Sequence, residues 1–242
     1  MLTENMKRIL SASQERGWVL EPDAKRLFSM AGLDVPRFAW VSTEEEALRS
    51  ARAIGYPVVC KVVSPQVIHK SDIGGVALGV DSDQSLVETF RRFSKVEGFA
   101  GMLVEETVSG VELIVGAKID YQFGPVVLLG IGGTGVEIYR DIALRMAPLG
   151  ESDIESMIRG LKAHKILEGY RGAAPVNLEE LTRLLENLSS LVMDLQETIE
   201  SIDLNPVISS PTRCVVADAR IILRKDQGEE NLRQGDSLCS IS

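Results

Sequence analysis

The sequence predicts an α+β fold. Segments rich in β-branched residues cluster in the middle of the 242-residue chain, and segments with helical spacing of apolar residues lie toward both ends. The expected strands do not alternate strictly with helices, as they do in a doubly wound parallel sheet. The chain is 45% hydrophobic and 25% charged, which is enough apolar material for a real core, and its length fits one large domain or two small ones.

Capping and spacing signals place the helices. Pro22 suits the first turn of a helix, apolar residues follow at helical spacing, and Gly32 ends it. Ser42, with Glu45 three residues later, forms a capping-box pattern that opens another helix. Helices are therefore expected over residues 1–16, 21–31, 42–54, 82–93, 153–162 and 178–197.

Runs of β-branched and apolar residues between turn signals predict the strands. Two of these runs are joined by a turn at Ser109–Gly110, and the last two form a closing pair. A polar tail over residues 225–242 follows them. Strands are expected over residues 35–42, 57–64, 75–80, 101–108, 111–120, 124–133, 199–209 and 213–223.

Charge and cysteine usage restrict the function classes. The formal net charge of −9 argues against broad binding to nucleic acid or anionic membranes, but it leaves room for a local cationic pocket for a phosphate ligand. Cys60, Cys214 and Cys239 stand far apart without a CxxC pair, which indicates free thiols in a reducing compartment rather than a zinc site. The N-terminus lacks a signal-peptide pattern, and the longest apolar runs are too short to span a bilayer. We therefore expect a cytoplasmic protein.

Two glycine-bearing segments are candidate ligand loops. Lys61 lies within the apolar run VVCKVV, where it could either reach water along a sheet edge or supply charge to nucleotide phosphates. In the second case, the amides of the following Gly74–Gly75 loop would cradle phosphate oxygens. The segment GIGGTGVE over 130–137 matches neither the P-loop nor the dinucleotide fingerprint, which argues against a nicotinamide enzyme. It is either a turn or a loop over a ligand.

Oxygen-bearing residues on the last strands suggest a cation site. Asp203 and Asn205 are two apart on one strand, so their side chains share a face, and Asp218 on the next strand could lie opposite Asn205. Such a set suits Mg²⁺, although an isolated Asp-x-Asn also marks ordinary turns. Glu112 interrupts an apolar strand and could accept hydrogen bonds from ribose hydroxyls, with a solvated surface as the alternative.

Long segments of the chain resemble a known family. They are GYPVVCKVVSPQVIHKSDIGGVALGV, GMLVEETVSGVELIVGAKIDYQFGPVVLLGIGGTGVEIYRDIALRMAPL, and the pair IDLNPVI and VVADARI. In this order they resemble the ATP-grasp subunit of ADP-forming acyl-CoA synthetases, best known as the beta subunit of ADP-forming acetyl-CoA synthetase. Succinyl-CoA synthetase is a more distant relative. The resemblance runs from about Leu20 to Leu223, nearly the whole globular chain.

The resemblance implies an ATP-grasp fold, in which two α+β lobes grip ATP between their sheets. It divides the chain into an N-terminal helix over 1–19, an ATP-grasp domain over 20–224 and a polar tail over 225–242, with a smaller lobe of roughly 33–103. The implied cofactors are ATP or ADP and Mg²⁺.

Site residues follow from the same resemblance. Lys61 would contact the phosphates, the backbone from Glu105 to Thr107 would read the adenine edge, and Glu112 would lie near the ribose. Asn205 and Asp218 would be the Mg²⁺ ligands.

The loop SPQVIHKSDIGGV would then hold a phosphoryl carrier rather than a chance histidine in a surface turn. His69 suits this role, because neutral imidazole is a good nucleophile near pH 7 and phosphohistidine is energetic enough to phosphorylate ADP. Lys70 and the amides of Gly74 and Gly75 could neutralise the phosphate, and Asp203 could orient the ring.

The chain carries no CoA-binding Rossmann domain, so the resemblance implies a CoA-binding alpha-type partner in an α2β2 assembly. Ser201 departs from the glutamate that the family usually has, Cys60 replaces an aliphatic residue, and His164 matches no motif and is expected at the surface or a helix end. Two alternatives stay open. One is a free-standing ATP-grasp ligase, which needs no histidine in this loop. The other is an inactive nucleotide-binding regulatory module, which Ser201 leaves open but against which the retained Lys61, His69, Asn205 and Asp218 argue.

Overall fold

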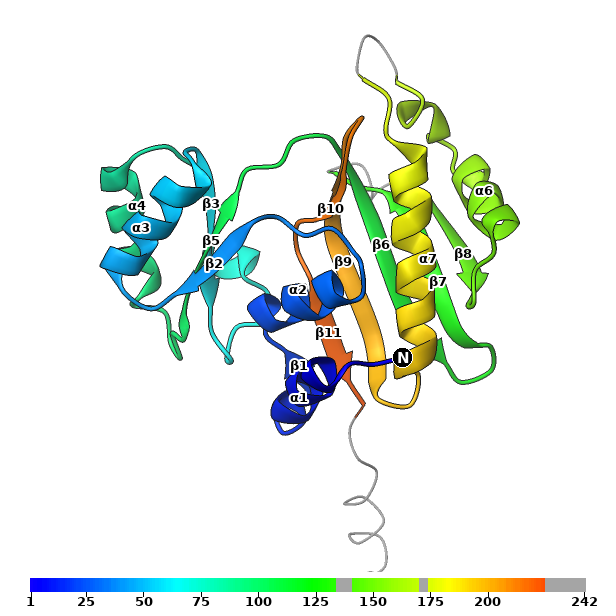
Figure 1. The fold of residues 1–242 in the computed structure, drawn as a ribbon, viewed down its shortest axis with the longest axis horizontal. Coiled ribbons are helices and arrows are strands. Elements are labelled where there is room, and N and C mark those ends of the chain that lie inside the picture. Colours follow the sequence, from blue (N-terminus) through cyan, green and yellow to red (C-terminus); the bar gives the residue numbers. More distant parts are fainter. Residues whose placement is uncertain (134–140, 170–173, 225–242) are drawn as a thin grey trace, which may run out of the picture.

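The computed structural model describes residues 1–133, 141–169 and 174–224. These residues form two β-sheets, one on each side of the molecule, and helix α2 (Glu21–Met30) lies where the two sides meet (Figure 1). Every pairing between named strands is antiparallel, and the helices pack on the sheets. The α+β prediction is confirmed.

The smaller sheet has the order β2-β5-β3-β4, so β3 is an interior strand. Side chains alternate between the two faces of a strand. Cys60 and Val62 of β3 enter a core that includes side chains of α3 and α4, whereas Lys61 points the other way and meets α2 at Glu21. The sheet-edge interpretation of Lys61 is therefore wrong. The elements of this lobe are β2 (Phe38–Val41), α3 (Glu44–Ile54), β3 (Val58–Val63), the 3-10 turn η1 (Ser71–Ile73), β4 (Val76–Val80), α4 (Asp83–Phe93) and β5 (Gly101–Glu106).

The larger sheet has the order β1-β11-β9-β6-β7-β8, and β10 also pairs with β9. The long helix α7 crosses one face of this sheet (Figure 1), and its leucines, such as Leu185 and Leu188, share one buried core with Val115 and Leu129 of the strands. The remaining elements are α1 (Glu4–Ser13), β1 (Trp18–Val19), β6 (Val111–Asp120), β7 (Gly124–Ile131), β8 (Ile142–Met146), α6 (Glu151–Gly160), the 3-10 turn η2 (His164–Ile166), α7 (Leu178–Leu195), β9 (Ile199–Ser209), β10 (Cys214–Val216) and β11 (Arg220–Leu223).

Three expected elements differ from the structure. Thr43 rather than Ser42 caps α3, because the Thr43 hydroxyl accepts the hydrogen bond from a first-turn amide. The strand expected over 213–223 is two strands, β10 and β11, separated by a turn. Residues 1–19 are not wholly helical, because β1 joins the edge of the larger sheet beside β11.

Two segments carry the chain between the lobes. The expected strands at 101–108 and 111–120 are β5 and β6, yet they belong to different sheets, so residues 107–110 cross from one lobe to the other. The second crossing lies just before β2, at residues 34–37. The turn at Ser109–Gly110 is therefore a connection between lobes rather than a hairpin within one sheet.

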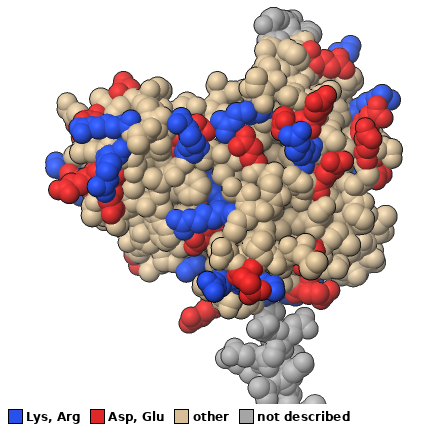
Figure 2. All heavy atoms as spheres, in the orientation of Figure 1, with Lys and Arg blue, Asp and Glu red and all other residues tan. Residues whose placement is uncertain are grey.

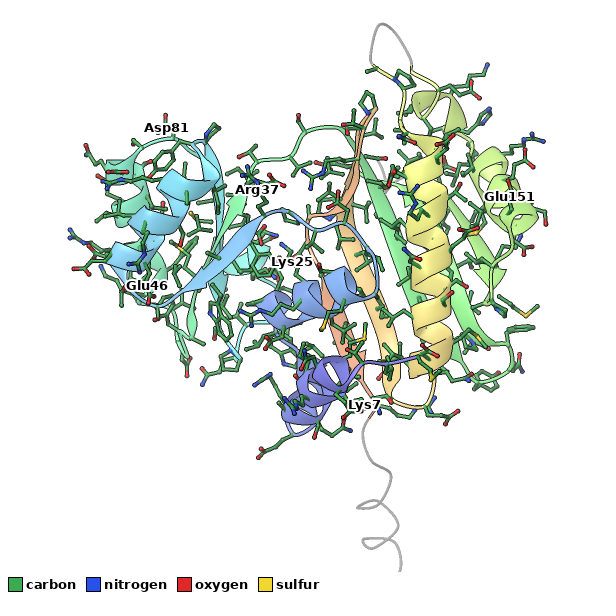
Figure 3. The ribbon with its side chains drawn as sticks, in the orientation of Figure 1. Lys7, Lys25, Arg37, Glu46, Asp81 and Glu151 are labelled. Carbon is green, nitrogen blue, oxygen red and sulfur yellow. The ribbon has the colours of Figure 1, made fainter. Side chains whose placement is uncertain are left out.

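A chain of ion pairs ties the two crossings to the larger lobe. Arg213, in the turn between β9 and β10, donates to both carboxylate oxygens of Asp34 at 2.8 and 3.0 Å and to Glu106 at 2.9 Å. Arg37, labelled in Figure 3, donates to Glu106 at 2.7 Å. Burial raises the pKa of the Glu106 carboxyl, but the hydrogen bonds from Arg37 and Arg213 outweigh it and hold that pKa at about 2.

No helix in the described part of the chain is long and apolar enough to cross a membrane. On the face drawn in Figure 2, lysine and arginine are interspersed with aspartate and glutamate. The described cysteines, Cys60 and Cys214, are buried free thiols. The predictions for the tail over 225–242, for Cys239 and for residues 134–137 of the second glycine loop fall outside the described residues.

Candidate active site between the two lobes

A cavity of about 320 Å³ opens between the start of α2, the loop after β3 and the strands β9 and β11. His69 and Lys70 reach it from the smaller lobe. Asp203, Asn205 and Asp218 reach it from the larger lobe. Five of the residues selected from the sequence therefore line one cavity, although the two groups lie far apart along the chain.

Strand pairing explains the oxygen-bearing side of the cavity. Asp203 lies directly opposite Arg220 in the β9–β11 ladder, and Asn205, two residues on, lines the cavity beside it. Asp218 lies in the turn before β11 rather than within a strand, which corrects the expectation. Its backbone N–H donates to the carbonyl of Pro206 at 3.3 Å, and this contact keeps it next to Asn205.

Six charged side chains form what we call the lysine–carboxylate cluster beside the cavity. Lys61, only 6% exposed, lies at its centre. Its Nζ is 2.7 Å from Glu21, 3.3 Å from Glu105 and 3.5 Å from Asp218. The cluster consists of Lys25, Lys61, Lys70, Glu21, Glu105 and Asp218.

The other two lysines complete the pairing. Lys70 Nζ is 2.9 Å from Glu21 and 3.3 Å from Asp218. Lys25 is fully buried, lies 2.9 Å from Glu21 and donates a hydrogen bond to Glu105. Three ammonium groups thus face three carboxylates. This balance is required, because a buried charge without a partner is strongly destabilising.

The pKa values of Glu21 and Asp218 in the cluster shift in opposite directions. Burial raises the pKa of Glu21, but the charges of Lys25 and Lys61 outweigh it and leave that pKa well below the ordinary value. Burial lowers the pKa of Lys61, but Glu21 and the other carboxylates leave it well above the ordinary value. Asp218 behaves differently, because burial and the neighbouring charge of Glu21 raise its pKa. Asp218 is therefore the member whose charge is least compensated.

An added cation would satisfy an atom that the protein leaves without a hydrogen bond. Oδ1 of Asp218 is buried and lacks a hydrogen-bond partner, and the ammonium groups of Lys70 and Lys61 lie 3.3 and 3.5 Å from it. No three Asp, Glu, His or Cys side chains within the described ranges gather closely enough to hold a metal by themselves. The Asn205 and Asp218 pair nevertheless fits Mg²⁺, which is commonly held by one or two side chains together with water and substrate phosphates.

The amides of the Gly74–Gly75 loop do not face a ligand. The N–H of Gly74 donates to Ser71 at 3.1 Å, and the N–H of Gly75 donates to Lys70 at 2.8 Å. Both groups close the turn around η1, so the expectation that they cradle a phosphate is wrong. Their role is steric: Gly74 takes a left-handed φ of 65°, and a Cβ on Gly75 would lie 2.5 Å from Val62.

The residues expected around the base and ribose do not line the cavity. The Glu105 side chain points into the lysine–carboxylate cluster. The hydroxyl of Thr107 donates to the carbonyl of Pro57 at 2.8 Å, at the crossing between the lobes. Glu112 is an exposed residue on β6 whose carbonyl accepts from Gly132 at 2.7 Å. Their contacts with nucleotide remain predictions.

The imidazole of His69 meets an arginine rather than an aspartate. Nε2 of His69 lies 3.4 Å from Nη1 of Arg220, and Nη2 of the same arginine donates to Asp203 at 2.8 Å. The expectation that Asp203 orients the imidazole itself is therefore wrong, because the guanidinium occupies the position between them.

Glu21, Lys25 and Arg220 were not among the site residues predicted from the sequence. Arg220 is two residues beyond Asp218, and this spacing could have pointed to it. No comparable signal marks Glu21 and Lys25, because a helical pair of opposite charges usually lies in solvent.

Two further positions do not line this cavity. Ser201 is on β9, paired with Lys118 on one side and Ile222 on the other. His164 lies in η2 and lines a different, larger cavity of about 560 Å³ beside α6 and α7. That cavity contains none of the site residues selected from the sequence.

Comparison with known proteins identifies the family. The ATP-grasp domain family matches residues 11–223. The chain is 40% identical to acetate–CoA ligase [ADP-forming] I subunit beta of Pyrococcus furiosus, with 89% of this chain and 96% of that protein covered. It is 36% identical to 4-hydroxybutyrate–CoA ligase [ADP-forming] of Nitrosopumilus maritimus, with 86% of this chain but only 31% of that protein covered.

A solved structure extends this similarity to the fold. Dinucleotide-forming acetyl-coenzyme A synthetase 1 of Ca. Korarchaeum cryptofilum, in complex with coenzyme A and Mg-AMPPCP, has a chain that is 41% identical with a TM-score of 0.80. The match covers 90% of this chain and all of that one. The phosphohistidine segment of that protein is described as pointing towards its nucleotide-binding site. The present chain has the ATP-grasp fold and belongs to the ATP-grasp family, among the beta-type subunits of ADP-forming acyl-CoA synthetases.

Proposed function

We propose that His69 of this subunit carries a phosphoryl group between ATP or ADP and an acyl phosphate. The overall reaction is acid + CoA + ATP = acyl-CoA + ADP + phosphate. One observation supports the proposal most strongly: His69 and Lys70 of one lobe share a cavity with Asp203, Asn205 and Asp218 of the other. A nucleophilic imidazole beside oxygen ligands and cationic groups suits phosphoryl transfer, which depends on positioning and charge stabilisation.

The remaining site residues would bind the nucleotide and its Mg²⁺. Asn205 and Asp218 would hold Mg²⁺, which when bound neutralises charge on the phosphates. Lys61 and Lys70 lie within 3.5 Å of the Asp218 carboxylate, so their charges are available to phosphates that enter beside it. The backbone from Glu105 to Thr107 would contact the adenine at the crossing between the lobes.

A partner subunit completes the reaction. The Pyrococcus furiosus relative of nearly equal length is named a beta subunit, and the Nitrosopumilus maritimus relative is about three times as long as the matched region. We infer that this chain works with a CoA-binding alpha-type subunit in an α2β2 assembly, and that the complex is cytoplasmic. The partner would bind the acid and CoA, while this chain would bind the nucleotide.

Phosphorylation of the protein tests the proposal. The full chain is incubated with Mg²⁺ and γ-labelled ATP, and the protein is examined for label that is labile in acid and stable in base. We expect label in the wild-type chain and in His164→Ala, which removes the other histidine of the sequence, and none in His69→Ala. Label that persists in His69→Ala, or a wild-type chain that stays unlabelled with and without its partner, contradicts the proposal.

The same measurement separates the alternatives. A regulatory module would bind ATP without becoming labelled under any condition. A free-standing ATP-grasp ligase would consume ATP with an acid and an amine or thiol, and His69→Ala would retain that activity.

A further inference from the structure

Arg220 makes two contacts that join the lobes at the reactive histidine. Its Nη2 donates to Asp203 Oδ2 at 2.8 Å, and its Nη1 lies 3.4 Å from His69 Nε2. Arg220 and Asp203 are direct partners in the β9–β11 ladder, so their side chains share the face that lines the cavity. His69 approaches from the loop after β3, in the other lobe.

The chemistry of the two groups fixes which imidazole nitrogen is reactive. A guanidinium has five N–H donors and no acceptor, so the nitrogen that faces it must offer a lone pair. His69 therefore carries its proton on Nδ1 in this arrangement and presents the lone pair of Nε2 toward Arg220 and the cavity. The nucleophilic atom and the guanidinium lie side by side.

The other groups of the loop that could neutralise a phosphate have more partners of their own than Arg220 has. Lys70 Nζ lies within 3.3 Å of two carboxylates, Glu21 and Asp218. The amides of Gly74 and Gly75 close their own turn. Arg220 has one carboxylate partner, Asp203, and a second nitrogen directed at the imidazole. Its planar fork also matches phosphate oxygens better than an ammonium does.

We propose that Arg220 binds the phosphoryl group while Nε2 of His69 carries it, and that Asp203 acts on the reaction by positioning Arg220. The inference rests on the proposed function. In the step itself, the Nε2 lone pair forms the bond to the γ-phosphorus as the bond from that phosphorus to the bridging oxygen breaks. ADP leaves with that electron pair, and the Nδ1 proton leaves to water. The new phosphoryl dianion then lies beside the guanidinium, which stabilises it.

Variants of the full chain test this assignment with γ-labelled ATP and Mg²⁺. We expect Arg220→Met to lower the fraction of labelled protein by about 10- to 100-fold, the range for losing a hydrogen bond to a charged group. Asp203→Asn keeps the arginine but removes its anchor, and we expect a smaller loss, about 3- to 10-fold. The effects should not multiply in the double variant, because both act through one guanidinium. The matched control is Arg224→Met at the end of the same strand, where the arginine pairs with Glu197 at 3.6 Å outside the cavity.

Two readouts separate this role from a general structural one. The affinity for a non-hydrolysable ATP analogue should stay within about threefold of wild type in both single variants, because Arg220 would contact the phosphoryl group that His69 carries rather than the bound nucleotide. In addition, ³¹P–¹H correlation spectra of the labelled wild-type protein should place the phosphorus on Nε2.

The outcomes distinguish the two proposals. Wild-type labelling in both Arg220→Met and Asp203→Asn, or phosphorus on Nδ1, overturns the role of Arg220 while His69 remains the carrier. An unlabelled wild-type chain overturns both. If Arg220→Met does not fold, Asp203→Asn decides the question, and wild-type labelling there counts against the assignment.

Discussion

Lys25 offers the sharpest test of the lysine–carboxylate cluster. It is fully buried and pairs with Glu21 at 2.9 Å and with Glu105. Figure 3 labels Lys25 beside α2, where the two lobes meet. Lys25→Met removes one of three ammonium groups and leaves three carboxylates facing two lysines. Breaking a buried pair in this way costs about 3–5 kcal/mol. We expect the lower end, about 3 kcal/mol, because Glu21 and Glu105 both keep Lys61 within 3.3 Å.

Thermal unfolding measures the effect. For a domain of this size about 1 kcal/mol shifts Tm by about 2–4 °C, so Lys25→Met should lower Tm by about 6–12 °C. Lys7→Met is the matched control, because Lys7 pairs with Glu4 at 2.8 Å on the exposed face of α1. Its Tm should change by less than about 2 °C.

A double variant tests the electrostatic reasoning itself. Glu105→Gln in the Lys25→Met background removes the uncompensated charge, so the double variant should lose less stability than the two single losses added together. A Lys25→Met protein that melts within about 2 °C of wild type would refute the reasoning. Strict additivity in the cycle would also refute it, since it would mean that the charges do not interact.

Three further outcomes are expected. The pKa of Glu106, held near 2 rather than at 4.5, corresponds to at most about 3 kcal/mol of stability, which is fully present above pH 4.5 and is lost as the pH falls toward 2. Urea unfolding between pH 6 and pH 2.5 should therefore show a weaker acid dependence in Arg213→Ala than in wild type, and parallel curves would contradict the assignment. Gly75→Ala should lower Tm and reduce labelling of the protein by ATP, because its Cβ would lie 2.5 Å from Val62, and an unchanged Tm would contradict the close packing. Burial raises the pKa of the Cys60 thiol to about 12, so mass spectrometry should find it unalkylated at pH 8 in the folded chain and alkylated after denaturation.

Local patterns in the sequence determined much of this protein. The α+β class and the approximate extent of most elements follow from the spacing of apolar residues. When one face of a strand or helix is buried, apolar residues recur every second residue or at helical spacing. The same reasoning grouped Asp203 and Asn205 on one face, whereas Asp218 lies in the turn before β11 and not in the strand expected for it. The resemblance of long ordered segments gave the family, which the comparisons confirm.

Tertiary structure decided the contacts that have no local signature. Glu4 and Lys7 in α1 resemble Glu21 and Lys25 in α2 as charged pairs on the first turns of helices, yet one pair is exposed and the other is buried. The two pairs differ because α2 packs between the two sheets. This packing buries a pair of charged residues that the sequence alone would place on the surface, next to the cavity. The pairing of Arg220 with His69 likewise exists only because the lobes meet there. The hydrogen-bond partners of the Gly74 and Gly75 amides could not be predicted from the sequence. The same sequence can form a turn whose amides bond within the turn or a turn whose amides face a ligand.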